Sequence, residues 1–415
     1  MTTRHRKVAV IGAGIVGVSA AIWLQRSGAD VTLIDRTGPA SGTSYGNGGI
    51  LASCSMVPVT TPGLVVKAPG MLFNPDFPLF LRWSYLPKLA PWLRNYLKHA
   101  NDKDTRRIAQ GLTGITGDSL EQHQALATGT IAARFVKPSE YGFAYADRAA
   151  FEADSYVWEL RREAGFVPDI VEGEAVREDE PGFGRAVNLL ALVNGHGFVT
   201  SPGGYVQALA KQFENSGGTF VKSEVKDFDL QDGQIAAVLT DQGKIQCDAA
   251  VLSSGVWSKS LAHRLGLNVP MESERGYHIV FRNPSVALSR PYMVTAGKFV
   301  ATQMEDGLRC AGVVEFGGLE AEATEAPFNL IRKKVRETFA DLSWDTTDEW
   351  MGHRPAPADS LPLIGEIGQT GIHTAYGHHH IGLTGGPKTG RLVAGLIMGD
   401  APNIDLQPYS PNRFA

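Results

Sequence analysis

Cysteine is scarce in this sequence. Its 415 residues include only three cysteines, Cys54, Cys247 and Cys310, and no two of them are closely spaced. Disulfide-stabilised secreted domains and zinc sites both need several closely spaced cysteines. The scarcity therefore argues against both classes and indicates a reducing compartment, in which the three thiols stay isolated.

The chain also lacks a strong net charge and an unbroken hydrophobic run. Lysine and arginine number 39, aspartate and glutamate 43, and the formal charge is only -4. This balance gives no support to a nucleic-acid partner. No apolar stretch of membrane-spanning length is free of charge, glycine or proline. We expect a cytoplasmic protein, soluble or at most peripheral at the inner face of the cytoplasmic membrane.

The N-terminus imitates an export signal, because Arg4, His5, Arg6 and Lys7 precede an apolar run. A signal peptide has no need of three regularly spaced glycines, and its cleavage would destroy the glycine pattern described next. We therefore expect this run to be the first structural unit of a cytoplasmic chain.

Residues 8–36, VAVIGAGIVGVSAAIWLQRSGADVTLIDR, have the pattern of a strand, a helix and a second strand. Gly12 permits a sharp turn, Gly14 lets backbone approach a pyrophosphate, and Gly17 permits close packing of helix and strand. Phosphates would bind at the N-terminus of the helix. Asp35 ends the second strand, where it can accept hydrogen bonds from a ribose. The stretch predicts a dinucleotide site.

Two later segments, 248–257 and 371–376, also read as buried strands that end in glycine or small polar residues. A length of 415 residues favours two domains. Because the strands predicted to meet the ligand are scattered along the chain, one of these domains should be discontinuous. We predict an α/β fold in which a Rossmann-like dinucleotide domain carries an inserted α+β substrate domain with a mostly antiparallel sheet. The predicted ranges are 1–60, 195–268 and 350–415 for the dinucleotide domain, and 61–194 and 269–349 for the substrate domain.

Residues 58–99 are rich in proline and in aromatic side chains interleaved with lysine and arginine. Pro87 and Pro91 predict a break into short helices. A basic amphipathic segment with tryptophan and tyrosine at its edges can lie on a membrane surface. The same pattern fits a lid or core-facing helices whose cations are solvated, and we favour this second interpretation.

Four segments together resemble the FAD-dependent amine and amino-acid oxidoreductases of the D-amino-acid oxidase and glycine oxidase superfamily. These segments are VIGAGIVGVSAAIWLQRSG, TSYGNGGI, AVLSSGVWS, and GHRPAPADSLPLIGE with the following GHHHIGLTGGPKTG. Within the superfamily the chain is most similar to the small subunit of bacterial D-amino-acid dehydrogenase. The resemblance spans essentially the whole chain and implies FAD as cofactor.

The resemblance implies which residues bind FAD. They are Gly12, Gly14, Ile15, Val16, Gly17, Asp35, Arg36, Ser41, Thr43, Ser44, Asn47, Gly48, Gly49, Val225, Ser254, Gly255, Trp257, Gly382, Leu383 and Thr384. The backbone of Val225 would pair with the adenine. The turn that begins at Gly382 would direct N-H groups at flavin N1 and the C2 carbonyl, where a helix N-terminus stabilises an anionic reduced flavin.

Arg354 matches the arginine that binds the substrate carboxylate in the amino-acid oxidising members. Its planar guanidinium suits bidentate binding of a carboxylate. The alternative is a structural ion pair with Asp359 or Glu366, and we favour substrate binding.

Two departures from the family pattern concern the substrate and the flavin. The tyrosine that often shares the carboxylate aligns with Phe299, so Tyr277, Tyr376 or His378 would take its place. No cysteine occurs near Gly352, where the sarcosine-oxidase branch attaches its flavin. We therefore predict noncovalent FAD, and we name Arg354, His378 and Tyr277 as catalytic residues.

The run His378, His379 and His380 suggests a metal site at first sight. Adjacent histidines point in different directions, and no cluster of cysteine or carboxylate accompanies them, so we predict no metal. Of the three, we expect His378 to lie near the flavin, and His379 and His380 to include a packing residue.

The predicted activity is oxidative deamination of an amino acid, with a D-amino acid favoured. Hydride transfer from Cα to flavin N5 would give an imine that hydrolyses to a 2-oxo acid, without a dedicated protein base. The electron acceptor would be a quinone or oxygen. A partner subunit is an open alternative, as are a secondary-amine, opine or hydroxyproline-type oxidase or dehydrogenase and a flavoprotein without enzymatic activity.

Overall fold

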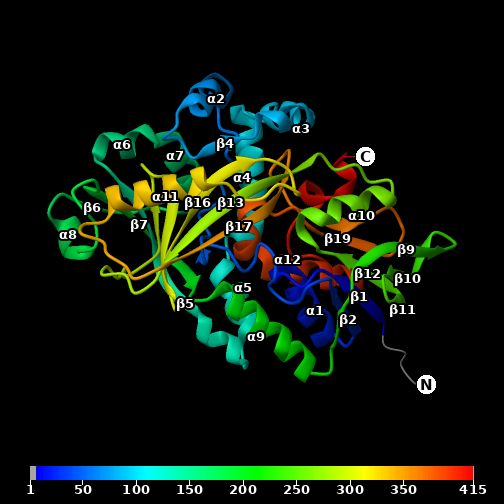
Figure 1. The fold of residues 1–415 in the computed structure, drawn as a ribbon. Coiled ribbons are helices and arrows are strands. Elements are labelled where there is room, and N and C mark those ends of the chain that lie inside the picture. The colour runs from blue at the N-terminus through cyan, green and yellow to red at the C-terminus, as the bar shows by residue number, and fades with distance from the viewer. Residues whose placement is uncertain (1–5, 415) are drawn as a thin grey trace.

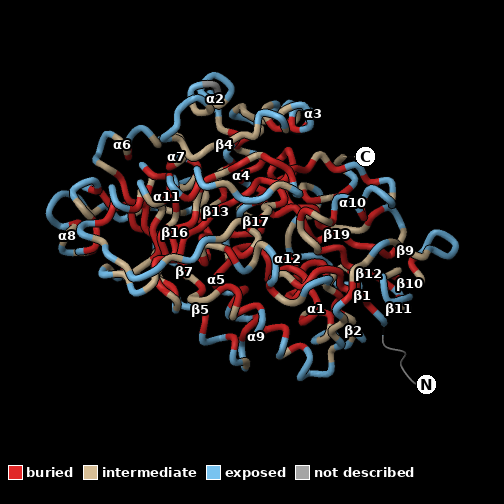
Figure 2. The backbone as a smooth tube through the Cα atoms, in the orientation of Figure 1, coloured by how far each residue is buried: buried red, intermediate tan, exposed pale blue. Residues whose placement is uncertain are grey.

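The computed structural model describes residues 6–414, apart from the side chain of Pro69. Arg4 and His5 of the basic run lie outside the described residues. Two large sheets lie side by side, with helices packed around them (Figure 1). Buried residues concentrate along the strands, whereas much of α2 (Leu64–Phe73) is exposed (Figure 2).

The first sheet contains the predicted dinucleotide-binding stretch. In spatial order its strands are β18 (Leu363–Glu366), β19 (Ile372–Tyr376), β12 (Ala249–Leu252), β1 (Lys7–Ile11), β2 (Asp30–Asp35) and β8 (Thr219–Lys222). These neighbours run parallel except for β18 and β19. Strands from separate parts of the chain therefore form one Rossmann-like sheet, which confirms the predicted fold class.

Helices cover one face of this sheet, and a small antiparallel sheet covers the other. The helices are α1 (Ile15–Arg26), α9 (Pro202–Asn215) and α12 (Gly382–Met398); the small sheet is β9 (Val225–Gln231), β10 (Gln234–Thr240) and β11 (Gly243–Gln246), with α10 (Ser258–Arg264) beside it. Because side chains alternate along a strand, Val8 and Val10 of β1 join the core under the helices, and Ala9 and Ile11 join the core on the other face.

Helices α1 and α12 pack very closely because glycines line their contact. A Cβ on Gly390 would lie 2.6 Å from the backbone nitrogen of Ala20, and a Cβ on Gly17 would lie 1.8 Å from the carbonyl oxygen of Gly12. Only glycine fits at such distances. Since α1 follows β1 and α12 follows β19 in a parallel arrangement, both helices begin at the same edge of the sheet.

The second sheet is mostly antiparallel. Its strands in order are β17 (Thr347–Pro357), β13 (Met271–Phe281), β16 (Gly307–Phe316), β15 (Phe299–Met304), β14 (Tyr292–Val294), β5 (Val136–Tyr145), β7 (Leu189–Val199) and β3 (Ile50–Leu51), with β4 (Leu79–Leu81) on β16 and β6 (Asp169–Glu172) on β7. The pairs β14–β5 and β4–β16 are parallel. Helix α11 (Glu325–Thr338) packs on one face over an apolar core.

The domain ranges stay a prediction, but two predicted boundaries fall inside strands. The boundary at 194/195 lies within β7, and the boundary at 349/350 lies within β17. Strand β3 pairs with β7 although its residues belong to the predicted range 1–60. Hydrogen bonding therefore continues across each of these points, so the large sheet takes in residues that we assigned to the dinucleotide domain.

The break predicted at Pro91 is wrong. Helix α3 (Leu86–Leu97) continues through Pro91, and Pro87 lies in its first turn, where a missing N-H group costs little. Trp92 is buried against β17, and its indole Nε1 donates to the carbonyl of Ala356 at 2.9 Å. This burial stabilises the helix across the proline and supports the core-facing interpretation of the segment.

The other helices lie outside the two sheets. They are α4 (Asp102–Thr116), α5 (Ser119–Ala127), α6 (Arg148–Ala153), α7 (Ser155–Glu163) and α8 (Ala175–Asp179).

The glycine contact between α1 and α12 can be tested with two alanine substitutions in α12. Gly390→Ala should lower the free energy of unfolding by about 1–3 kcal/mol, because its Cβ would push the helices apart. Gly395→Ala is the matched control, because a Cβ there meets its nearest neighbour, the Cβ of Asp400, at 3.5 Å. Alanine at that position should stabilise by up to about 1 kcal/mol through helix propensity. Equal urea midpoints for the two variants would contradict the close packing.

Candidate active site

A cavity of about 880 Å³ is bordered by both large sheets. This volume is near the upper end of the range for small-molecule sites. Every residue predicted to bind the cofactor or to act in catalysis borders this cavity, with the exceptions of Gly17 and Gly49. Both exceptions lie beneath it, where a Cβ would collide with backbone at 1.8 Å for Gly17 and at 2.7 Å for Gly49.

One end of the cavity is formed by the turn between β1 and α1. Gly12 has a φ of +104°, and a Cβ there would lie 2.7 Å from the carbonyl oxygen of Ser253. Gly14 is the N-cap residue of α1 and has no side chain to cap the helix. The N-H of Ile15, the first residue of the helix, donates to Ser44 Oγ at 3.0 Å. An uncapped helix N-terminus beside bare backbone is suited to a pyrophosphate.

Asp35 holds this end of the cavity in shape. Its Oδ2 accepts from the N-H of Ala13 at 2.8 Å, and its Oδ1 accepts from the N-H groups of Thr37 and Gly38, each at 2.9 Å. The carboxylate therefore joins the turn after β1 to the loop after β2. The predicted contact of Asp35 with a ribose stays a prediction.

Beyond Asp35 the cavity is lined by a cation and an aromatic ring. The guanidinium of Arg36 lies over the indole of Trp257 at 4.3 Å from the ring centroid. The other predicted residues that border this region are Val225, Ser254 and Gly255. A flat, partly apolar recess of this kind suits an adenine.

The loop 41–49 connects the two sheets and is fixed by hydrogen bonds. Thr43 Oγ1 donates to the carbonyl of His353 at 2.8 Å, and Asn47 Oδ1 accepts from the N-H of Gly49 at 2.8 Å. Side chains of the large sheet donate to carbonyls of the loop: His278 to Gly46, Arg309 to Tyr45 and Asn47, and Thr302 to Gly48. Ser41 Oγ donates to the carbonyl of Gly38 at 2.8 Å within the loop. The loop is therefore an ordered wall rather than a flexible connection.

The N-terminus of α12 forms the facing wall. The helix begins at Gly382 without a side-chain cap, and Leu383 and Thr384 border the cavity. Its first turn is anchored from behind, since Ser119 Oγ donates to the Thr384 carbonyl at 2.8 Å and His123 Nε2 contacts the Leu383 carbonyl at 2.9 Å. Two helix N-termini thus border one cavity, and both favour negative charge. These features fit FAD, with its pyrophosphate at α1 and its flavin at α12.

Arg354 projects from β17 across β13. A Cβ on Gly276 would lie 2.5 Å from the Arg354 guanidinium, so the arginine side chain fits over this position only because residue 276 is glycine. Arg354 Nη1 donates to the carbonyl of Val313 at 3.3 Å. Glu274 is the strand neighbour of Arg354. Burial lowers the pKa of Arg354, and Glu274 opposes that shift.

The alternative ion pairs proposed for Arg354 do not form in this structure. Asp359 pairs instead with Arg413 at 2.7 Å, and Glu366 Oε1 accepts from the N-H of Gly371 at 2.7 Å. Arg354 keeps its hydrogen bond to the Val313 carbonyl and borders the cavity, from which a ligand carboxylate can reach its guanidinium.

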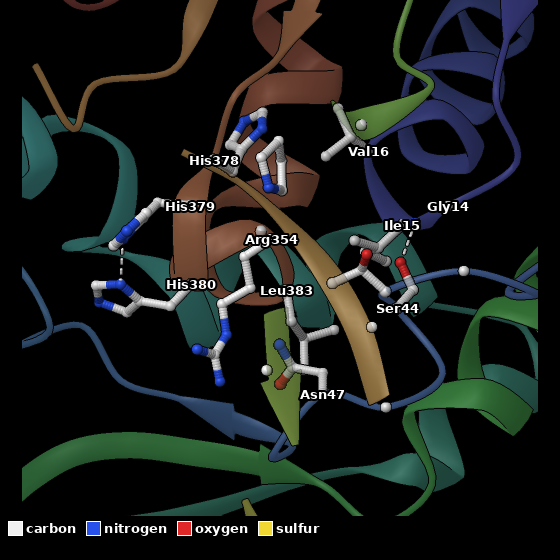
Figure 3. Close-up of a pocket in the computed structure, with 18 of the residues that line it drawn as sticks. Gly14, Ile15, Val16, Ser44, Asn47, Arg354, His378, His379, His380 and Leu383 are labelled. Carbon is white, nitrogen blue, oxygen red and sulfur yellow. Dashed lines mark hydrogen bonds between the residues drawn. The ribbon is translucent and has the colours of Figure 1, made fainter. Parts of the chain in front are cut away.

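Two histidines accompany Arg354. In Figure 3, His379 and His380 lie on the same side of the cavity as Arg354, whereas Gly14, Ile15 and Ser44 lie on the other side. The third member of the run, His378, contacts Thr389 Oγ1 through Nε2 at 2.9 Å, and burial lowers its pKa to about 3. A catalytic role for His378 stays a prediction, whereas the two histidines on the side of Arg354 are the pair that we expected to include a packing residue.

The residues predicted to replace the carboxylate-binding tyrosine do not lie beside Arg354. Tyr277 neighbours Gly276 in β13, so its ring points to the opposite face of the sheet, where its hydroxyl donates to Glu315 and its ring packs on Phe328. Tyr376 is buried in the core under the small sheet. Phe299 lies in the core beneath α11. Tyr277 borders the cavity while its hydroxyl donates to Glu315, and a catalytic role for Tyr277 stays a prediction.

Sequence reasoning missed Glu274 and the pair His379 and His380. The alternation in β13 could have revealed Glu274, because residues 274 and 276 share one face of a strand. The histidine pair gave no such signal, because its arrangement depends on a positive φ of 50° at His379.

Within residues 6–414 no group of three or more His, Cys, Asp or Glu side chains is arranged to hold a metal. Cys54, Cys247 and Cys310 are buried, and none of them borders the cavity. None of the described helices combines the length and the apolar character needed to cross a membrane.

Comparisons with known proteins identify the family of the chain. A family model described as FAD dependent oxidoreductase matches residues 7–396. A D-amino-acid oxidase of Bradyrhizobium diazoefficiens is 37% identical over 417 residues, covering 99% of each chain. A D-amino acid dehydrogenase of Rhizobium rhizogenes is 27% identical over 439 residues, covering 98% of this chain and 100% of that protein.

The structure of glycine oxidase from Bacillus cereus superposes with a TM-score of 0.71 at 19% identity, covering 96% of this chain and 99% of that chain. At this identity the likeness concerns the fold, and it agrees with the two-sheet architecture. With the family match over residues 7–396 and a full-length relative at 37% identity, the chain belongs to the FAD-dependent oxidoreductases.

Proposed function

We propose that this protein catalyses the FAD-dependent oxidative deamination of a D-amino acid to an imine, which hydrolyses to a 2-oxo acid. The observation that carries the proposal is Arg354, which packs over Gly276 and borders the cavity on the same side as Leu383 of α12, away from Gly14 and Ile15 (Figure 3). The full-length relatives named D-amino-acid oxidase and D-amino acid dehydrogenase support the substrate class.

FAD, when bound, supplies the acceptor for the hydride that leaves Cα. Arg354 binds the substrate carboxylate and thereby fixes the position of Cα. The N-terminus of α12 stabilises negative charge that develops near Leu383 and Thr384. Val300, Met293 and Phe143 follow one another on adjacent strands along the cavity, and this apolar wall receives the substrate side chain.

We propose oxygen or a quinone as the electron acceptor, since the full-length relatives include a protein named an oxidase and proteins named dehydrogenases. We propose that the surface formed by α2 and Trp83 contacts a membrane or a partner subunit. Val66, Phe73 and Trp83 are 84%, 73% and 56% exposed there. We place the protein in the cytoplasm, with this surface available for peripheral contact.

The activity predicts reduction of the bound flavin by substrate. Under anaerobic conditions a D-amino acid should bleach the flavin absorbance of the purified protein, and its L-enantiomer should not. The screen should include D- and L-amino acids, proline derivatives and N-alkyl amino acids. Bleaching only by N-alkyl compounds would assign the protein to secondary amines, and no bleaching by any compound would favour a flavoprotein without turnover.

The role of Arg354 predicts a specific loss of substrate affinity. Arg354→Ala should raise KM by about 10- to 100-fold, because charge-assisted hydrogen bonds contribute roughly 1.5–3 kcal/mol. The FAD content should stay unchanged. Arg107→Ala, at an exposed arginine of α4, is the control and should retain the KM of the parent protein. An unchanged KM in Arg354→Ala would remove the arginine from the substrate site.

The acceptor can be identified from product ratios. If oxygen reoxidises the flavin, the protein should release equal amounts of hydrogen peroxide and 2-oxo acid under air. A soluble quinone added under air should then leave the peroxide yield nearly unchanged. A yield of peroxide far below that of 2-oxo acid, together with turnover that requires added quinone, would instead assign the protein to the dehydrogenases.

A further inference from the structure

Three side chains form a continuous row from β13 to the cavity. Glu274 Oε2 lies 2.7 Å from His379 Nε2, and His379 Nδ1 lies 2.6 Å from His380 Nδ1. Figure 3 shows the contact between the two rings and the position of His380 beside Arg354. Glu274 and His379 are buried at 5% and 6% exposure, whereas the exposed surface of His380 borders the cavity.

The row depends on a strained backbone conformation at His379. Its φ of 50° lies in the left-handed region, which costs a non-glycine residue roughly 1–2 kcal/mol. The preceding Gly377 also has a positive φ, 85°. In this conformation the ring of His379 contacts Glu274, and His380 borders the cavity.

The row determines which nitrogen atoms carry hydrogen. A lone pair on His379 Nε2 would face the Glu274 carboxylate at 2.7 Å, so Nε2 carries a proton even though the contact is bent away from the ideal N-H direction. A neutral His379 then has its lone pair on Nδ1. At 2.6 Å the partner atom His380 Nδ1 must carry the hydrogen of the shared contact. His380 Nε2 is left with a lone pair and cannot donate to a carboxylate.

The charged groups around the row set the charge at its two ends. Burial alone would raise the pKa of Glu274, but His379, Arg354 and His380 together lower it, so the carboxylate is ionised. His380 is open only toward the cavity and is otherwise enclosed by protein, and this burial together with His379 and Arg354 lowers its pKa to about 3, so its ring is neutral before substrate binds. From α3, Tyr96 also faces Glu274, and burial together with that carboxylate raises its pKa, which keeps the phenol neutral.

We propose that His380 takes the proton from the ammonium group of the substrate, and that His379 and Glu274 position it and receive the charge. The N-H bond of the ammonium breaks and an Nε2-H bond forms on His380. The Nδ1-H bond of His380 breaks and an Nδ1-H bond forms on His379. The substrate is left as the neutral amine, whose nitrogen lone pair supports departure of the hydride, and the positive charge rests on His379 against the Glu274 carboxylate.

Substrate binding itself prepares this transfer. Arg354 opposes a positive charge on His380, although Glu274 already offsets part of the charge of the arginine. The substrate carboxylate neutralises Arg354, and the basicity of His380 rises at the moment when the ammonium arrives beside it. This inference rests on the proposed amino-acid oxidation and adds to it the group that deprotonates the substrate.

The test is the pH dependence of flavin reduction, measured by anaerobic stopped-flow absorbance with the D-amino acid that bleaches the parent protein fastest. The parent protein should reach its maximal rate constant well below the pKa of the free substrate ammonium. In His380→Gln the rate constant should rise about tenfold per pH unit up to that pKa and approach the parent value above it. Glu274→Gln should shift the profile in the same direction by a smaller amount.

Glu272→Gln is the matched control, because Glu272 is a glutamate of the same strand at 9% exposure that contacts the Tyr85 hydroxyl at 3.1 Å and does not border the cavity. Its profile should superimpose on that of the parent protein. Profiles of His380→Gln and Glu274→Gln that also superimpose would overturn the proposal while leaving the proposed function intact. If His380→Gln does not retain FAD, the pH profile of Glu274→Gln alone decides whether the proposal holds. Absence of flavin reduction in the parent protein at every pH would instead refute the proposed function.

Discussion

The close approach of α1 and α12 is the constraint on which the site depends. Gly17 has no side chain, so α1 can pack directly on the turn after β1. Gly390 has none either, so α12 can approach the backbone of α1. As a result both helices begin at one edge of the parallel sheet and present uncapped N-termini to the same cavity. A dinucleotide has two acidic regions, the pyrophosphate and the reduced flavin, and this arrangement supplies one positive helix end for each.

The pleat of β13 divides the second sheet into a binding face and a structural face. Glu274 and Gly276 face the cavity with Arg354, while Arg275 and Tyr277 face away and converge on Glu315. Since neighbouring residues of a strand point in opposite directions, a shift of register by one residue would exchange the two sets completely. The eleven-residue pairing of β13 with β17 therefore fixes the identity of the substrate-facing groups.

Sequence patterns could predict the dinucleotide end of the site better than the substrate end. The roles of Gly12 and Gly17 follow from spacing, because the turn and the packing that they permit are local. The helix through Pro91 and the outward position of Tyr277 depend instead on burial and strand register, which are set by residues far away in the chain. His379 was the hardest case, because its positive φ contradicts the local preference of histidine and is held only by the surrounding fold.

The substrate end of the cavity matches the charges of a zwitterion. Arg354 offers a positive charge for a carboxylate. Its strand neighbour Glu274 contacts His379, and His379 contacts His380, whose proposed lone pair would meet the ammonium group. In the proposed roles, a hydroxy acid would bind Arg354 but bring no ammonium proton to His380, and a simple amine would leave Arg354 without a carboxylate from the ligand. The two proposed roles together would therefore favour amino acids over molecules that carry only one of the two groups.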